Sequence, residues 1–187
     1  SKLIYTFVML VLFRLVIVIP APGVDIARLN EAGMRDLPLL QLMNMMTGNA
    51  FSQLTIMAMG VSPYINSSII MQLLTIAIPA LERMQKSGPD GQKKIAQITR
   101  YVTVVLAVIQ AIGLVSSVGF IKPGWYNYVL VGASMAAGTA LAMWMGERIT
   151  EKGIGNGISL LIFVGIVVNL FSGYSNLLIT AIQNPTF

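Results

Sequence analysis

The sequence contains neither cysteine nor histidine, and charged residues are scarce. Without these two residue types, the 187 residues offer no disulfide, cysteine nucleophile, histidine base or Cys/His zinc site. Charged residues make up 10% of the chain and hydrophobic residues 56%, and the mean hydropathy is +0.78. Because the apolar residues fall into blocks, we expect an all-α polytopic membrane protein with no metal and no cofactor.

Five apolar blocks are long enough to cross a bilayer as helices. They lie at about 3–20, 60–79, 102–118, 126–145 and 155–171. The first block contains Arg14 and ends at the prolines of Pro20–Gly23, which favours a retained helix over a cleaved signal peptide. We expect a charged cytoplasmic loop at 81–101, with a turn at Ser87–Gly91, and an external tail at 172–187 that is too short to cross.

A shorter apolar run, LPLLQLMNMMTG, extends from Leu37 to Gly48 within a region at about 24–50. As a helix it would reach roughly half of the ~30 Å hydrocarbon thickness, so it cannot span the membrane. Pro38 suits the start of a helix and Gly48 its end. We therefore expect a half-length helix that dips into the protein rather than into lipid.

The basic residues indicate an orientation. With the N-terminus in the cytoplasm, Arg14 lies within a span and three basic residues lie outside, namely Arg28, Arg35 and Lys122. The inside then holds Lys2, Arg83, Lys86, Lys93, Lys94, Arg100, Arg148 and Lys152. This bias follows the positive-inside rule, so the formal net charge of +5 requires no nucleic-acid partner.

All acidic residues lie outside the apolar blocks. These are Asp25, Glu31, Asp36, Glu82, Asp90, Glu147 and Glu151. A proton- or cation-coupled carrier usually keeps a carboxylate at membrane depth, so half of a small-solute secondary transporter is the weaker alternative. An intramembrane enzyme would need a Ser-His, paired-Asp or metal constellation, and the sequence supplies none.

Two segments each present a pair of isoleucines four residues apart. GVSPYINSSIIMQLL carries Ile65 and Ile69, and GERITEKGIGNGISLLIFVGI carries Ile162 and Ile166. Residues i and i+4 share one face of a helix, so two facing helices would present four aliphatic side chains to a narrow space. Without further information, the same spacing is also the ordinary stripe of a helix that packs or faces lipid.

Longer stretches around these pairs resemble a known family. TIMAMGVSPYINSSIIMQLL (Thr55–Leu74) and WMGERITEKGIGNGISLLIFVGI (Trp144–Ile166) closely resemble the two signature regions of the SecY family, the central subunits of the Sec protein translocon. FRLVIVIPAPGVD and KKIAQITRY look like the end of its first helix and the entry to its third. The resemblance covers essentially the whole chain and is of the bacterial type. The family has ten transmembrane helices in two inverted halves, and this chain resembles the first five, so we expect a fragment or one half whose partner half lies elsewhere.

The resemblance implies roles for particular residues. Ile65, Ile69, Ile162 and Ile166 match four members of a six-membered pore ring. The second and third helices would form one wall of a lateral gate, in which Gln110 matches a polar position. The half-length run matches the plug below the ring, with residues Leu37, Pro38, Leu39, Leu40, Leu42, Met43, Met45 and Met46. Methionines suit a surface that repacks as it moves, and equally an ordinary gap-filling core.

The implied function is a non-enzymatic protein-conducting channel in the bacterial cytoplasmic (inner) membrane. It would move unfolded secretory polypeptides across the membrane and release transmembrane segments laterally into lipid. The implied partners are SecE, a SecG-type subunit, a SecA motor or ribosome, signal sequences and nascent polypeptides, membrane lipids and the C-terminal half of the channel. The expected basic cytoplasmic loop contains Arg83, Lys86, Lys93, Lys94 and Arg100. We expect this loop either to bind the motor or ribosome or to be a solvated loop without a partner.

Overall fold

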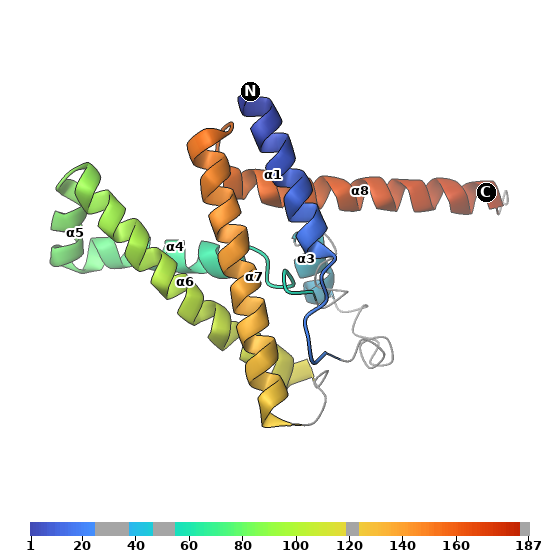
Figure 1. Ribbon diagram of the computed structural model, residues 1–187, viewed down its shortest axis with the longest axis horizontal. Helices are drawn as coiled ribbons and strands as arrows, with labels where there is room; N and C mark the ends of the chain where they lie inside the picture. The colour runs from blue at the N-terminus through green and yellow to red at the C-terminus, as the bar shows by residue number, and fades with distance from the viewer. Residues whose placement is uncertain (25–37, 47–54, 119–123, 184–187) are drawn as a thin grey trace.

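The computed structural model describes residues 1–24, 38–46, 55–118 and 124–183, which are almost entirely helical (Figure 1). In chain order the helices are α1 (Lys2–Ile17), α3 (Pro38–Met46), α4 (Ser62–Ala77), α5 (Pro79–Lys86), α6 (Pro89–Val118), α7 (Trp125–Lys152) and α8 (Gly157–Gln183). The described parts contain no strand, and an isolated antiparallel bridge joins Pro20 and Thr55. The expected all-α class is therefore confirmed.

Three described helices, α6, α7 and α8, are long and apolar enough to cross a membrane. A fourth span results if α4 and α5 are counted together, although their axes differ by 102°. Helix α1 has 16 residues, which corresponds to about 24 Å of helix and falls short of a full hydrocarbon crossing. The architecture is that of a multi-pass membrane protein.

Helix α7 lies at the centre of the described structure, with α1 alongside it and α8 crossing both (Figure 1). It packs against α1, α4, α6 and α8, and 56% of its most apolar window is buried. Small residues permit this close packing: a Cβ added at Gly132 would lie 3.1 Å from a side-chain carbon of Ile112 on α6. In membranes, such small residues let helix backbones approach each other closely.

The segment 55–61 passes between the helices and joins two parts of the core. The Ile56 backbone N–H donates to the Ile19 carbonyl at 3.2 Å, which fixes the segment to the end of α1. Met57 is fully buried against α1, α7 and α8, and Met59 is buried against α6 and α7. These two methionines therefore fill gaps in a packed core, one of the two roles that the sequence allowed.

The region 81–101 is helical, which corrects the expectation of an extended loop. Only Ser87 and Gly88 separate α5 from α6, and Gly88 takes a φ of +93°, which side-chain-bearing residues adopt only with strain. Pro79 and Pro89 begin the flanking helices, because a first-turn residue needs no backbone N–H donor. The predicted turn is thus confined to two residues, and the charges lie on helices.

Helix α8 continues to Gln183, so residues 172–183 are not a separate tail. No proline interrupts this stretch, and its small polar side chains bond back to their own helix. Ser175 Oγ donates to the Ser172 carbonyl at 2.9 Å and Thr180 Oγ1 to the Asn176 carbonyl at 2.8 Å. These polar residues are compatible with the helix rather than signals for its end.

The start of α1, the start of α6, the end of α7 and the start of α8 lie at one end of the structure. The Ile154 N–H donates to Thr6 Oγ1 at 3.3 Å, and Arg100 pairs with Glu147. A Cβ at Gly23 would instead contact Asn127, near the start of α7, at the opposite end. Basic residues from three of these helices, including Lys2 on α1, Arg100 on α6 and Lys152 on α7, therefore lie toward one end, and its cytoplasmic side stays a prediction.

Gly138 provides a test of this packing. A Cβ at Gly138 would lie 1.8 Å from the Ile56 carbonyl oxygen, so Gly138→Ala must displace the 55–61 segment from α7. We expect a loss of about 1–3 kcal/mol of stability, the usual cost of overpacking. The measurement is the thermal unfolding midpoint of the detergent-solubilised protein. Gly113→Ala on α6 is the matched control, since its Cβ meets nothing within 4 Å; equal midpoints for the two variants would contradict the close contact.

Candidate functional site

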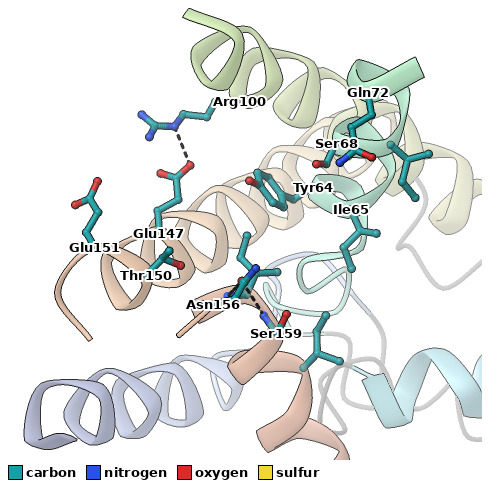
Figure 2. Close-up of a pocket in the computed structure, with 13 residues that line it drawn as sticks. Tyr64, Ile65, Ser68, Gln72, Arg100, Glu147, Thr150, Glu151, Asn156 and Ser159 are labelled. Carbon is teal, nitrogen blue, oxygen red and sulfur yellow. Dashed lines mark hydrogen bonds and ion pairs between the residues drawn. The ribbon is translucent and has the colours of Figure 1, made fainter. Parts of the chain in front are cut away.

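A cavity of about 580 Å³ lies between α4, α7 and the start of α8, with one residue from α6 at its edge (Figure 2). Its lining falls into two chemical groups. The polar group consists of Tyr64, Ser68, Gln72, Arg100, Glu147, Thr150, Glu151, Asn156 and Ser159. The aliphatic group consists of Ile65, Ile69, Ile158 and Ile162. A single space therefore has both polar residues and aliphatic residues in its wall, and the aliphatic ones lie on α4 and α8.

An ion pair joins α6 to α7 across the polar part of the cavity. Arg100 Nε donates to Glu147 Oε1 at 2.9 Å, as the dashed line in Figure 2 shows. The Glu147 side chain is 22% exposed and the Arg100 side chain 45% exposed, so the pair is partly shielded from solvent. Partial shielding weakens screening by salt, and the pair contributes more than a fully exposed one would.

The turn between α7 and α8 is fixed by backbone contact. A Cβ at Gly157 would lie 1.9 Å from the Gly146 carbonyl oxygen, so only glycine fits where α8 begins against α7. Thr150 Oγ1 donates to that same carbonyl at 2.9 Å and accepts from the Gly157 N–H at 2.8 Å. One hydroxyl thus satisfies a group on each helix and determines where α8 starts.

Asn156 caps the start of α8 inside the cavity. Its Oδ1 accepts from the backbone N–H groups of Ile158 at 3.1 Å and Ser159 at 3.3 Å, an arrangement typical of an N-cap. Figure 2 places Asn156 and Ser159 together in the cavity wall. Ile162 follows about 9 Å further along the helix axis. The first two turns of α8 thus contribute both polar and aliphatic residues to the lining.

The structure brings together three of the four isoleucines proposed for the ring. Ile65 and Ile69 of α4 and Ile162 of α8 line the same cavity. Ile65 and Ile162 also pack against the core formed by α1, α7 and α8, whereas Ile69 is 50% exposed. Ile166 is partly buried one turn beyond Ile162 and lies outside the cavity lining.

The serines between the α4 isoleucines have separate roles. Ser68 lines the cavity, whereas Ser67 is fully buried and hydrogen-bonds Thr103 of α6. Gln110 is partly buried on α6 and is not in the cavity lining. The five basic residues predicted to face the cytoplasm are all exposed, and Arg100 is the member that reaches the cavity.

The predicted plug run is helical from Pro38 to Met46 and packs on α8 (Figure 1). Gln41, Leu42 and Met45 are exposed. Leu37 lies outside the described residues, and three of the predicted plug residues have side chains that the structure does not describe, namely Leu39, Leu40 and Met43. The half-length helix is therefore present, and its described partner is α8.

Sequence reasoning missed much of the polar lining. The G-N-G pattern before an apolar run is typical of a helix N-cap and could have identified Asn156. No sequence signal pairs Arg100 with Glu147, because they lie 47 positions apart on different helices. Across the described ranges, no group of three or more acidic residues is placed to hold a metal ion.

Comparison with known proteins identifies the family. The SecY family model matches residues 55–186, which include α4 to α8 and the whole cavity. The chain belongs to the SecY family. It is 42% identical to the protein translocase subunit SecY of Corynebacterium glutamicum, in a match that covers 95% of this chain and 44% of that relative. It is also 42% identical to the protein translocase subunit SecY of Escherichia coli K12, in a match that covers 90% of this chain and 40% of that relative. The chain thus spans less than half of the length of these SecY relatives.

Solved structures support the same fold. Sec61 in the canine ribosome-channel complex from the endoplasmic reticulum matches 92% of this chain with a TM-score of 0.71 at 23% identity. A structure described as that of a protein conducting channel matches with the same values. In both cases this chain covers 37% of the matched chain. The helical arrangement is therefore that of one part of a SecY-family channel.

The ion pair across the cavity can be tested with a double-mutant cycle. We expect Arg100→Gln and Glu147→Gln to show a coupling energy of up to about 1 kcal/mol in unfolding, because the pair is partly shielded and joins two helices. The control cycle uses Lys86 and Glu82, an i, i+4 pair on α5 with side chains 75% and 46% exposed, for which we expect about 0.3 kcal/mol. A smaller coupling for Arg100 and Glu147 than for the control would contradict this interpretation.

Proposed function

We propose that this chain forms the part of a protein-conducting channel that contains the central constriction. The observation that carries the proposal is the cavity in which polar residues from α4, α6, α7 and the start of α8 lie beside Ile65, Ile69 and Ile162. Its polar end lies with the basic end of the structure, where α6 and α8 begin. A polypeptide would enter there from the cytoplasm and pass between α4 and α8.

An aliphatic constriction suits a channel that must pass an unfolded chain and hold back ions. Apolar side chains in a narrow space exclude water. Because ions cannot cross a dewetted gap without losing their hydration, the gap blocks them without being sterically closed. Ile65, Ile69, Ile162 and Ile166 are the proposed members from this chain, with Ile166 joining the others when α8 shifts relative to α4. The chain itself catalyses no reaction and needs no cofactor in this role.

The remaining elements take roles around this constriction. Helix α3 is the proposed plug on the external side. Helices α4 and α6 form one wall of a lateral gate with Gln110 on α6, and the buried Ser67–Thr103 hydrogen bond supports their movement as one unit. The exposed cations of α5 and the start of α6 are the proposed contact for a SecA motor or ribosome. SecE, a SecG-type subunit and the remaining helices of the channel complete the proposed assembly in the bacterial inner membrane.

Polar substitution of the constriction is the first test. In the intact channel, Ile65→Asn or Ile162→Asn should wet the gap and raise the resting ion conductance at least several-fold. Ile70→Asn is the matched control, because Ile70 is on another face of α4, is 40% exposed and lies outside the cavity lining. The measurement is the resting ion conductance of each variant channel in a planar bilayer. Wild-type conductance for both cavity variants would refute the proposed constriction.

Site-specific crosslinking tests the path of the polypeptide. The chain has no cysteine, so Ile65→Cys or Ile162→Cys introduces a single thiol into this part of the channel. We expect either thiol to crosslink with successive cysteines of a stalled secretory chain, since both positions face the proposed conduit. Ile70→Cys, at a 40% exposed site on another face of α4 and outside the cavity lining, provides the control. Crosslinks from Ile70→Cys alone would place the conduit elsewhere, and a small-solute carrier would give none.

A further inference from the structure

Asn169 on α8 connects this helix to the end of α3. Its Nδ2 group donates to the Met45 carbonyl at 3.0 Å and to the Gly165 carbonyl of its own helix at 3.2 Å. A side-chain amide nitrogen carries two N–H donors, so each carbonyl can receive one of them. The side chain therefore bridges two helices while it remains bonded to its own backbone.

The Met45 carbonyl is the acceptor on α3, near the last described residue of Pro38–Met46. A backbone carbonyl oxygen has two lone pairs, so it can accept a bond from a neighbouring helix as well as one from its own backbone. The bond thus uses a backbone acceptor of α3 and attaches α3 to α8.

The bond adds to the packing of α3 on α8. Among the described elements, α3 packs on α8 and on no other helix. Leu42 is 56% exposed and Met45 is 42% exposed, so these two side chains add little apolar burial to the contact. A hydrogen bond between the two helices therefore gives their contact a fixed direction as well as some stability.

Asn169 also lies in register with the constriction. Ile162, Ile166 and Asn169 occupy positions i, i+4 and i+7 of α8, which share one face of a helix. Asn169 is about 10 Å beyond Ile162 along the helix axis, in the direction away from the Asn156 cap. The capped start of α8, the aliphatic residues and the contact with α3 therefore follow one another along a single helix.

We propose that Asn169 is a positioning residue that holds α3 in the closed state of the channel by donating to the Met45 carbonyl. Opening breaks this bond, while the bond to the Gly165 carbonyl keeps the amide partly satisfied on α8. The freed Met45 carbonyl becomes accessible to water as α3 leaves, so release costs little and is reversible. This inference rests on the proposed function, since it assigns α3 the role of the plug.

The decisive variant is Asn169→Ser in the intact channel. A serine hydroxyl has one donor and in a helix bonds the i−4 carbonyl, so this variant keeps the bond to Gly165 and loses the bond to Met45. Asn169→Leu removes both bonds at similar volume. Asn176→Ser is the matched control, because it makes the same change at an exposed position two turns further along α8.

Two measurements on reconstituted vesicles report the closed state. The first is the resting ion conductance per inserted channel. The second is the rate at which an impermeant maleimide labels Leu42→Cys on α3, in a segment that otherwise has no thiol. We expect Asn169→Ser and Asn169→Leu to raise both by about fivefold, the factor that corresponds to one lost neutral hydrogen bond, and Asn176→Ser to leave both unchanged.

The possible results separate this inference from the proposed function. If Asn169→Ser leaves conductance and labelling unchanged while Ile65→Asn raises conductance, the constriction stands and the role of Asn169 is refuted. If conductance rises without faster labelling of Leu42→Cys, α3 has not moved and the role is again refuted. Unchanged conductance in the ring variants would refute the constriction itself. If Asn169→Ser does not accumulate in the membrane, Asn169→Leu decides by the same two measurements.

Discussion

The backbone contact between α7 and α8 is the constraint on which the site depends. Gly146 and Gly157 approach so closely that neither helix could carry a side chain at the point of contact without moving the other. Thr150 then bonds a backbone group on each side of the turn. The position of α8 relative to α7 is therefore fixed by main-chain geometry, which is more rigid than contact between long side chains.

This fixed start of α8 explains why one cavity has two kinds of wall. The first turn of a helix leaves backbone N–H groups without partners, and Asn156 satisfies two of them, so this end is polar for a structural reason. Further along, α8 has all its backbone bonds and can present aliphatic side chains. Polar and aliphatic lining residues thus lie in successive turns of the same helix. Helix α4 supplies the opposite wall, with Tyr64, Ser68 and Gln72 beside Ile65 and Ile69.

The sequence predicted what depends on composition and periodicity. Apolar blocks located the helices, and the i, i+4 isoleucines identified three residues that line a common cavity. It misjudged 81–101 because charged residues and a Ser-Gly-Pro-Asp-Gly stretch are typical of loops, whereas prolines at helix starts allow the chain to remain helical around a two-residue turn. The bonds from Arg100 to Glu147 and from Asn169 to Met45 join residues 47 and 124 positions apart. No periodicity links such residues, so only their arrangement in space reveals them.

The arrangement along α8 has a mechanical consequence for gating. Ile162 lines the cavity, and Asn169 contacts α3 about two turns further along the same rigid helix. A rotation or shift of α8 that separates Ile162 from the α4 isoleucines also moves the Asn169 amide that bonds α3. Under the proposed function, a polypeptide that widens the constriction would therefore weaken the attachment of α3 without a separate signal. Coupling between the proposed ring and the proposed plug would then follow from their sharing one helix.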